Sequence, residues 1–359
     1  MREVDAIFES ESPITMWTAL VDRGDDTYYF YLWNSETGGQ KGDLRSCWIC
    51  NRIPAPQEVD KERMNAGIAP MQPAEFVGHD PDGMDLDADK LDIVWFEEGD
   101  AAALYYDGEM IAAIPCYSRK NGFYGYSKYA VGKGPFAHEL SGEALEDMTR
   151  RAERANAQWD WAESDFWPDV QQMHIDTAQK LFGEYEKYYA IDEGEFPPRA
   201  VIEGTRDGVK YEMTAGISTF RMPKTELYFE DNRDRCRIEL GFACDVNGPD
   251  ITEDIRTLMK AISDYPWDKD TFFAHGHSNG VDFIEGFGGI MFVSPRRVEG
   301  LPMPEYPEFR GDEIEFLWLV PLTQDEYELA RDSGSEQLFR YLENNEGLHI
   351  FNGEPKFLT

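Results

Sequence analysis

Two cysteines stand at a spacing that supports redox or metal chemistry in other proteins. Cys47 and Cys50 form a C-x-x-C pair. A redox dithiol needs a helix amino terminus that lowers the pKa of a thiol, whereas these cysteines lie inside a strand-like run with Trp and Ile between them. Zinc would need two further ligands, and the sequence has no second C-x-x-C and no H-x-x-x-H or similar pair. We therefore expect two buried thiols beside an aromatic side chain.

An acidic stretch downstream has aspartates at a spacing that resembles a calcium-binding loop. Its members are Asp80, Asp82, Asp85, Asp87 and Asp89. The EF-hand pattern, tried from Asp85, requires Gly and Glu where the chain has Lys90 and Phe96. The register therefore fails, and we expect a solvated acidic loop. The residues of this loop that we expect to contact a cationic protein are Asp80, Asp82, Asp85 and Asp87.

Two histidines, His275 and His277, are spaced to lie on one face of a strand, where two metal ligands can meet. No third ligand can be assigned, so we expect no metal and no cofactor. The sequence contains no P-loop, no G-x-G-x-x-G and no H-E-x-x-H motif. We predict that the chain has no catalytic residues. An enzyme with a site assembled from scattered residues, such as these histidines and Glu285, remains an open alternative.

The amino-terminal part of the chain reads as a series of strands. Apolar runs at residues 16–21 and 28–33 predict a hairpin, because a short polar turn separates them. Residues 93–96, 101–106 and 109–115 predict a meander. Its second turn is Asp-Gly at positions 107 and 108, which is a strong signal for a two-residue hairpin.

The carboxyl-terminal part alternates between strands and helices. Two strands at residues 210–222 and 226–240 are central. Gly216 is expected to allow a bend or a close approach in the first strand, and Pro223 is expected to end its ladder. A strand pair is expected within residues 283–293, around its glycines. The nearly continuous apolar run at 314–322 predicts a central strand that is covered on both faces.

Helices are predicted in the same part of the chain from periodicity and capping residues. Thr323 and Glu326 form a capping box, and Ser335 is a cap for the last helix. The other predicted helices are residues 141–159, 166–182 and 252–262.

Together these elements predict a mixed α/β fold of the α+β type. We expect a mostly antiparallel sheet with packed helices, preceded by a smaller β-rich domain. The expected domains are residues 1–140 and 141–359. Within the second domain, 141–183 is a helical lead-in and 196–343 is the α/β core.

Several sequence segments of the second domain resemble the suppressor-of-fused domain family. They are TAGISTFRM at residues 214–222, RIEL at 237–240, and the strand and helices of 316–342. The resemblance extends over roughly residues 166–343, and the front half is similar to the amino-terminal extension of bacterial members. It implies a function in protein binding. Animal members hold a short peptide between two domains, partly by strand addition, and bacterial relatives resemble immunity proteins of polymorphic toxin systems.

The charge of the chain restricts its partners. It has 34 Lys plus Arg against 70 Asp plus Glu, which gives a formal net charge of −36. Such a surface repels nucleic acid and anionic membranes and attracts basic proteins. Salt adaptation and GC-rich coding are alternative causes of the same composition.

We therefore predict a non-catalytic immunity protein that sequesters a cationic toxin. Besides the first acidic loop, Glu230, Asp231 and Asp234 are candidate contacts. A salt-adapted scaffold or regulatory binding protein is an alternative. The first residues lack a signal-peptide pattern and no apolar run is long enough to span a bilayer, so we expect a cytoplasmic protein.

Overall fold

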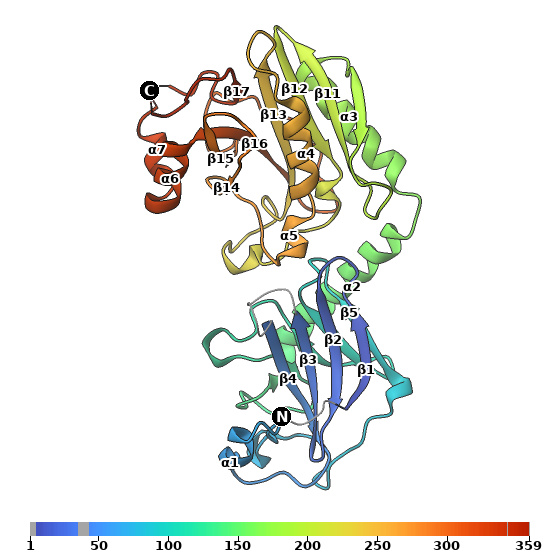
Figure 1. Cartoon of the computed structure of the whole chain (residues 1–359). Coiled ribbons are helices and arrows are strands. Elements are labelled where there is room, and N and C mark those ends of the chain that lie inside the picture. Colours follow the sequence, from blue (N-terminus) through green and yellow to red (C-terminus); the bar gives the residue numbers. More distant parts are fainter. Residues whose placement is uncertain (1–4, 35–42, 343, 359) are drawn as a thin grey trace. The chain divides into compact units, whose positions relative to one another are not determined.

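The computed structural model describes residues 5–34, 43–342 and 344–358, and these form two compact units. Unit 1 contains the described residues up to Ser164, together with 226–228 and 267–270. Unit 2 contains the other described residues, from Asp165 onward. In Figure 1 the blue to green segments belong to unit 1, and most of the segments from green to red belong to unit 2.

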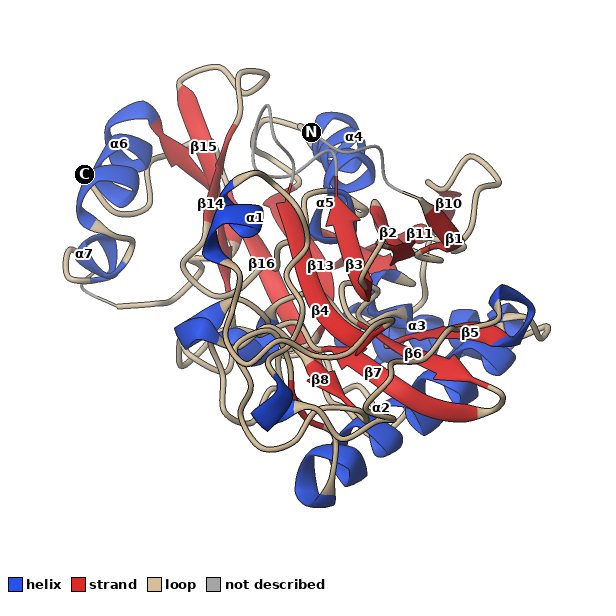
Figure 2. Ribbon diagram, turned by 90° about the horizontal axis from the view of Figure 1, so that it is seen from below, coloured by secondary structure: helices blue, strands red, loops and turns tan. Residues whose placement is uncertain are grey.

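Unit 1 contains two sheets around a shared core. The first has the strand order β1-β2-β3-β4 and the second the order β5-β6-β7-β8-β9. Strand β4 lies against β7 and β8 of the second sheet (Figure 2), and side chains such as Trp17, Trp48 and Leu104 fill the core. The strands are β1 (Ala6–Glu11), β2 (Trp17–Arg23), β3 (Thr27–Asn34), β4 (Asp43–Asn51), β5 (Leu91–Trp95), β6 (Ala102–Tyr106), β7 (Glu109–Ile114), β8 (Tyr126–Ser127) and β9 (His138–Glu139).

Helices cover part of the second sheet of unit 1. Helix α2 (Gly142–Ala162) packs on β5 and β6, and its buried face includes Met148 and Ala152. Helix α1 (Lys61–Asn65) is short and carries no buried side chain. Three 3-10 turns connect the strands, at Ala74–Phe76, Ala88–Lys90 and Lys120–Gly122.

Unit 2 is organised around one large mixed sheet with the order β10-β11-β12-β13-β16-β15-β14. Strand β13 pairs in parallel with β16 and, further along, with β17, whereas the other neighbouring strands of this sheet are antiparallel. The strands are β10 (Lys187–Ala190), β11 (Ala200–Arg206), β12 (Val209–Ala215), β13 (Arg237–Asp245), β14 (Ser278–Gly280), β15 (Phe287–Val293), β16 (Ile314–Thr323) and β17 (Ile350–Phe351).

Helices α3 and α4 pack on the strands of this sheet. Helix α3 (Trp167–Phe182) packs on β11 and β12 through Ala178 and Phe182, and α4 (Thr252–Ile262) packs on β12 and β13. The remaining helical segments are α5 (Tyr265–Asp268), α6 (Gln324–Ser333), α7 (Glu336–Phe339) and the 3-10 turns Ile217–Thr219 and Thr225–Leu227.

This architecture confirms the predicted fold class, a mixed and mostly antiparallel α+β arrangement with a smaller β-rich part in front. The local signals are also confirmed at several points. Asp107 and Gly108 both have positive φ, of 53° and 79°, as a two-residue hairpin of this type requires. Thr323 and Glu326 form the predicted capping box of α6. Strand β16 is buried along nearly its whole length.

The two central strands differ from the expected bounds. Strand β12 ends at Ala215 and β13 begins only at Arg237, because 3-10 turns and loop segments occupy the residues between them.

One expected strand pair is also wrong. Residues 283–293 were expected to contain two strands, but 283–286 form a turn that ends at Gly286 with φ of 82°. Only Phe287–Val293 is extended, and it pairs with β14 and β16. The glycine in the left-handed region turns the chain before β15 begins, so the first apolar residues of this run never reach the ladder.

Two glutamates on adjacent strands form a buried ion cluster beneath α4. Glu203 of β11 and Glu212 of β12 are register partners, and both are buried. Arg256 of α4 joins them, since its Nη2 donates to Glu203 Oε2 at 3.1 Å and its Nε donates to Glu212 Oε1 at 3.0 Å. Burial raises the pKa of Glu212 to about 7 even though Arg256 opposes the shift. Lys187 of β10 also pairs with Glu203, at 3.0 Å, so the arginine that attaches α4 is one of several cations around these two carboxylates.

This cluster gives a pH-dependent prediction. A carboxyl pKa raised from about 4.5 to about 7 means that the folded state retains a proton that the unfolded state has released. The resulting stabilisation is present below pH 4.5 and is lost as the pH rises through 7. Relative to Glu212→Gln, the wild type should lose roughly 2 to 3 kcal/mol of unfolding free energy across this window. Urea unfolding of the full chain at several pH values measures this difference in unfolding free energy. An exposed control, Glu285→Gln, should follow the wild type, and identical profiles for all three proteins would contradict the prediction.

Candidate functional site

The first predicted acidic loop lies in unit 1, and its four aspartates have different surroundings. Asp85 pairs with Arg52 Nε at 2.8 Å, and this hydrogen bond is the main reason that its pKa is lowered. Asp80 accepts from the backbone N–H of Asp82, and Asp87 caps the following 3-10 turn. Asp82 is exposed and forms no ion pair within the described residues. The loop is thus partly neutralised from within.

The second predicted group lies in unit 2, between β12 and β13. Asp231 pairs with Arg233 at 2.9 Å, and hydrogen bonds from Arg233 lower the pKa of Asp231 to about 2. Asp234 pairs with Arg235 at 3.3 Å. Both aspartates line a polar hollow of about 370 Å³. Glu230 is exposed and has no ion pair among the described side chains, so it is the carboxylate of this group that is most available to a partner.

The residues of the enzyme alternative are not gathered around a reactive centre. His275 Nδ1 accepts from the Ser294 backbone N–H at 3.3 Å, and its ring lies 5.2 Å from that of Phe339. The ring of His277 lies 5.3 Å from that of Phe272. Burial lowers the pKa of both histidines. Glu285 is exposed in the turn before β15. In the part of the chain that the structure describes, no three His, Cys, Asp or Glu side chains are grouped as metal ligands.

We expected no G-x-S-x-G elbow in this sequence, and at the level of the letters this was wrong, because residues 276–280 read G-H-S-N-G. An elbow places its serine on a sharp turn between a strand and a helix. Here Ser278 begins β14, a short strand at the edge of the sheet, and the segment leads into the turn before β15. The pattern is therefore present, but Ser278 does not lie on the strand-to-helix turn that a serine nucleophile requires.

Cys47 and Cys50 lie in β4, as the strand-like sequence predicted. Both are free, fully buried thiols on either side of the buried Trp48 and Ile49. Burial raises the pKa of both thiols far above the ordinary value. A protonated, enclosed thiol is a poor nucleophile and a poor metal ligand, so these cysteines act as core residues.

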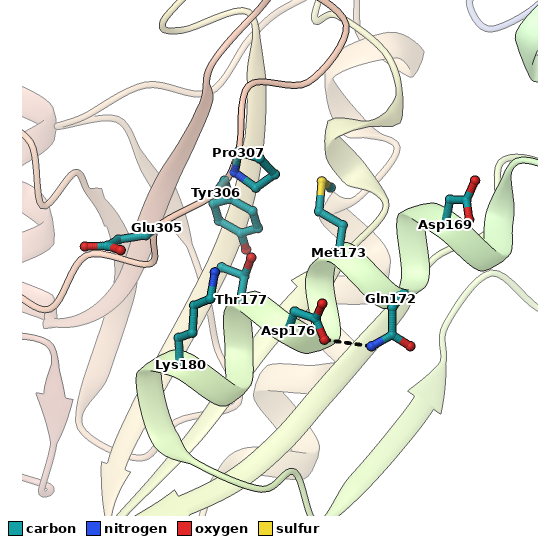
Figure 3. Close-up of a pocket in the computed structure, with 9 residues that line it drawn as sticks. All are labelled: Asp169, Gln172, Met173, Asp176, Thr177, Lys180, Glu305, Tyr306 and Pro307. Carbon is teal, nitrogen blue, oxygen red and sulfur yellow. Dashed lines mark hydrogen bonds between the residues drawn. The ribbon is translucent and has the colours of Figure 1, made fainter.

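A hollow of about 580 Å³ that sequence reasoning missed runs along α3 (Figure 3). One wall is a stripe of α3, and the other is the connector before β16. The lining residues are Asp169, Gln172, Met173, Asp176, Thr177, Lys180, Glu305, Tyr306 and Pro307. The i, i+3, i+4 spacing on α3 is visible in the sequence, but it reads as the solvated face of an amphipathic helix. No sequence signal brings residue 306 beside it.

A buried carboxylate links the two strands that carry the motifs. Glu239 of β13 is fully buried and accepts four hydrogen bonds. The donors are Thr214 Oγ1 (2.5 Å), Gly216 N (3.0 Å), Ser218 N (2.9 Å) and Ser218 Oγ (2.7 Å). Gly216 makes this possible, because its φ of 102° turns the chain from β12 into a 3-10 turn that aims the amides at Glu239. A side chain at this position would clash with the Pro198 carbonyl.

Arg237, two residues before Glu239, holds the same turn from its other end. Its Nη1 donates to the carbonyl oxygens of Ser218 and Thr219 at 3.1 and 2.8 Å. Its Nε donates to Asp312 Oδ2 at 2.9 Å, and Arg221 also reaches this aspartate at 3.1 Å. These charged groups are buried and satisfy one another. The segments 214–222 and 237–240 thus form one polar cluster inside the sheet.

His174 of α3 also belongs to this polar cluster. Together with Ser218 and Glu239 it supplies the residue types of a hydrolase triad. Its Nε2 lies 3.4 Å from both Ser218 Oγ and Glu239 Oε1. However, the three side chains are at most 1% exposed, and Ser218 donates to Glu239 rather than to the histidine. Burial lowers the pKa of His174 and keeps it neutral. A substrate has no access to the serine, so the grouping is structural.

Comparison with known proteins gives one result for this part of the chain. Residues 200–354 match the family model described as suppressor of fused protein (SUFU). These residues are a suppressor-of-fused domain. The resemblance predicted from the motifs is confirmed here, and both motif segments and β16 lie within the match. No curated protein matches the chain.

The suppressor-of-fused domain indicates a protein-binding module, because the family is a binding and regulatory family rather than a family of enzymes. The helices of the described residues include none with the length and apolar character needed to cross a bilayer.

The role of Glu239 in the suppressor-of-fused domain can be tested by truncation. Glu239→Ala should lower the unfolding free energy by ~3 kcal/mol or more, since each buried donor left without an acceptor costs about 1–3 kcal/mol. Thr214→Val removes one of the four donors and should cost less. Urea unfolding of the full chain measures both variants. Glu285→Ala on the surface is the control, and wild-type stability in Glu239→Ala would refute a central role for this carboxylate.

Proposed function

We propose that the chain is a protein-binding module that sequesters a basic protein, as an immunity protein does with a cationic toxin. The observation that supports it most is a suppressor-of-fused domain within a chain whose formal net charge is −36. The domain favours a protein as the partner. The charge favours a basic one, because opposite charge accelerates encounter and like charge rejects nucleic acid.

The distribution of cations in the structure supports an acidic binding surface. Arginines such as Arg237 and Arg256 neutralise carboxylates inside unit 2. Each of these arginines is matched by buried carboxylates, so such pairs do not consume the acidic excess of the chain, which has 70 acidic residues against 34 basic ones. Exposed carboxylates such as Asp82 and Glu230 therefore remain available to a partner, whereas Asp231 is already held by its neighbouring arginine.

The proposal is tested by capture followed by a functional assay. The immobilised full chain is incubated at low ionic strength with an extract of the source organism, and bound proteins are eluted in steps of rising salt. We expect a basic protein that elutes as salt increases, because screening weakens contacts between exposed charges. Expressed alone, this protein should inhibit growth of a host, and co-expression with the chain should restore growth. Absence of any growth effect would refute the immunity role and leave only binding.

The predicted acidic contacts are tested on the captured protein. A variant with Asp80, Asp82, Asp85, Asp87, Asp231 and Asp234 changed to Asn and Glu230 changed to Gln should bind about tenfold more weakly at low salt, with a shallower salt dependence. Binding is measured by calorimetry or interferometry over a salt series.

A charge-matched control distinguishes a local contact from loss of total charge. It carries amides at seven other acidic positions, namely Asp254, Asp282, Glu285, Glu299, Asp325, Glu328 and Asp332. This control should bind within twofold of the wild type. Equal affinity and salt slope in the loop variant and the wild type would show that the two loops are not the contact.

A further inference from the structure

The hollow along α3 carries charge that the described chain does not neutralise. Asp169, Asp176 and Glu305 line it, and none of the three forms an ion pair among the described residues. Asp176 accepts one hydrogen bond from Gln172 Nε2 at 2.7 Å, which is a neutral donor (Figure 3). Lys180 is the cation of the lining, and it too forms no ion pair in the described chain. The lining therefore has an excess of two negative charges.

Tyr306, in the connector that forms the second wall of the hollow, contributes an independent feature. The hydroxyl oxygen of Tyr306 is buried and has no hydrogen-bond partner among the described residues. The ring itself is fixed, since it lies 5.4 Å from His174 and 6.4 Å from Phe316. Burial raises the pKa of this hydroxyl well above its ordinary value, so it stays neutral and can accept or donate one hydrogen bond. A buried polar atom without a partner is costly, and a ligand group that reached it would remove that cost.

We propose that this hollow receives a basic side chain of the protein partner, with arginine preferred over lysine. This inference rests on the proposed binding of a basic protein and assigns it a receptor site. A guanidinium has five N–H donors in a plane and is weakly hydrated. It can pair with a carboxylate of the lining, Asp176 or Glu305, and one N–H can donate to the buried Tyr306 oxygen once Lys180 has moved aside. The volume of about 580 Å³ admits such a side chain together with neighbouring residues of its chain.

Lys180 acts as an internal competitor for this site. It extends from α3 toward Tyr306, and the two side chains point toward one another in Figure 3. Its ammonium group lies on a flexible stem without an ion pair in the described chain, so it can swing out of the hollow when a stronger cation enters. Binding of the partner therefore exchanges an internal cation for an external one.

The test uses the full chain and a fluorescein-labelled octa-arginine peptide, with binding followed by anisotropy at low ionic strength. The double variant Asp176→Asn and Glu305→Gln should weaken binding about five- to tenfold. The control Asp282→Asn and Glu285→Gln has the same net charge and should change binding less than twofold. Lys180→Ala should tighten binding, and an exposed control, Lys133→Ala, should leave it nearly unchanged.

Tyr306→Phe separates a ligand contact from a structural role. The variant keeps the ring and removes a hydroxyl that has no partner in the described chain, so its urea midpoint should not fall. Binding of octa-arginine should nevertheless weaken about two- to threefold. Octa-lysine should bind more weakly than octa-arginine to the wild type, and free arginine should not compete at the concentrations at which the peptide binds.

The failure of this site and the failure of the proposed function give different results. If the hollow variants and their charge-matched control bind octa-arginine equally, the hollow is not the receptor, although a captured basic protein would still support the proposed function. If the hollow variants show the expected effects and no toxic protein is captured, the receptor site stands and the immunity role is wrong. A lower urea midpoint for Tyr306→Phe would overturn the assignment of its hydroxyl to a ligand.

Discussion

The central strands of unit 2 meet at one buried carboxylate, Glu239, which pairs with no Lys or Arg among the described residues. Its charge is stabilised by two backbone amides and two hydroxyls of the segment that follows β12. Such a site forms only if Gly216 turns the chain and Arg237 holds the far end of the turn. The segments 214–222 and 237–240 therefore depend on each other, since each supplies groups that would be buried and unsatisfied without the other. Because these groups are buried, they assemble the sheet and are not exposed to a partner.

The shortage of cations shapes both the interior and the surface. Among the described residues the buried cations are arginines, namely Arg45, Arg199, Arg221 and Arg237. Arginine suits this role because its planar fork satisfies several acceptors at once, whereas a lysine would be harder to satisfy away from water. The buried carboxylates outnumber these arginines, so the interior is not the cause of the acidic exterior. The exterior is acidic because the whole chain has 34 Lys plus Arg against 70 Asp plus Glu, and such a surface attracts a basic partner.

The sequence predicted those elements whose signals are local. The Asp107-Gly108 hairpin, the capping box at Thr323 and the buried strand β16 each follow from a few adjacent residues. Strands β10 and β11 carried no such signal. Strand β10 has four residues, and β11 places Glu203 at an enclosed position where it pairs with Lys187 of β10 and with Arg256, which lies more than fifty residues later. The hollow along α3 was equally inaccessible to prediction, because Tyr306 reaches α3 from more than a hundred residues away and its hydroxyl becomes unusual only once it is enclosed.

The overall charge and the hollow act over different distances, and this difference bears on selectivity. The net charge of −36 attracts any basic protein, but its reach is limited to about 8–10 Å at physiological ionic strength. Long-range attraction alone therefore cannot separate one cationic partner from another. The hollow along α3 has exposed carboxylates on its walls and a defined lining, so it can select a ligand by shape as well as by charge. Lys180 increases the selectivity of the hollow, because a ligand must bind there more strongly than the ammonium group of Lys180 does. The acidic surface attracts many cationic proteins, and this attraction depends on salt. The hollow accepts few of them, so the specificity of binding depends on its geometry.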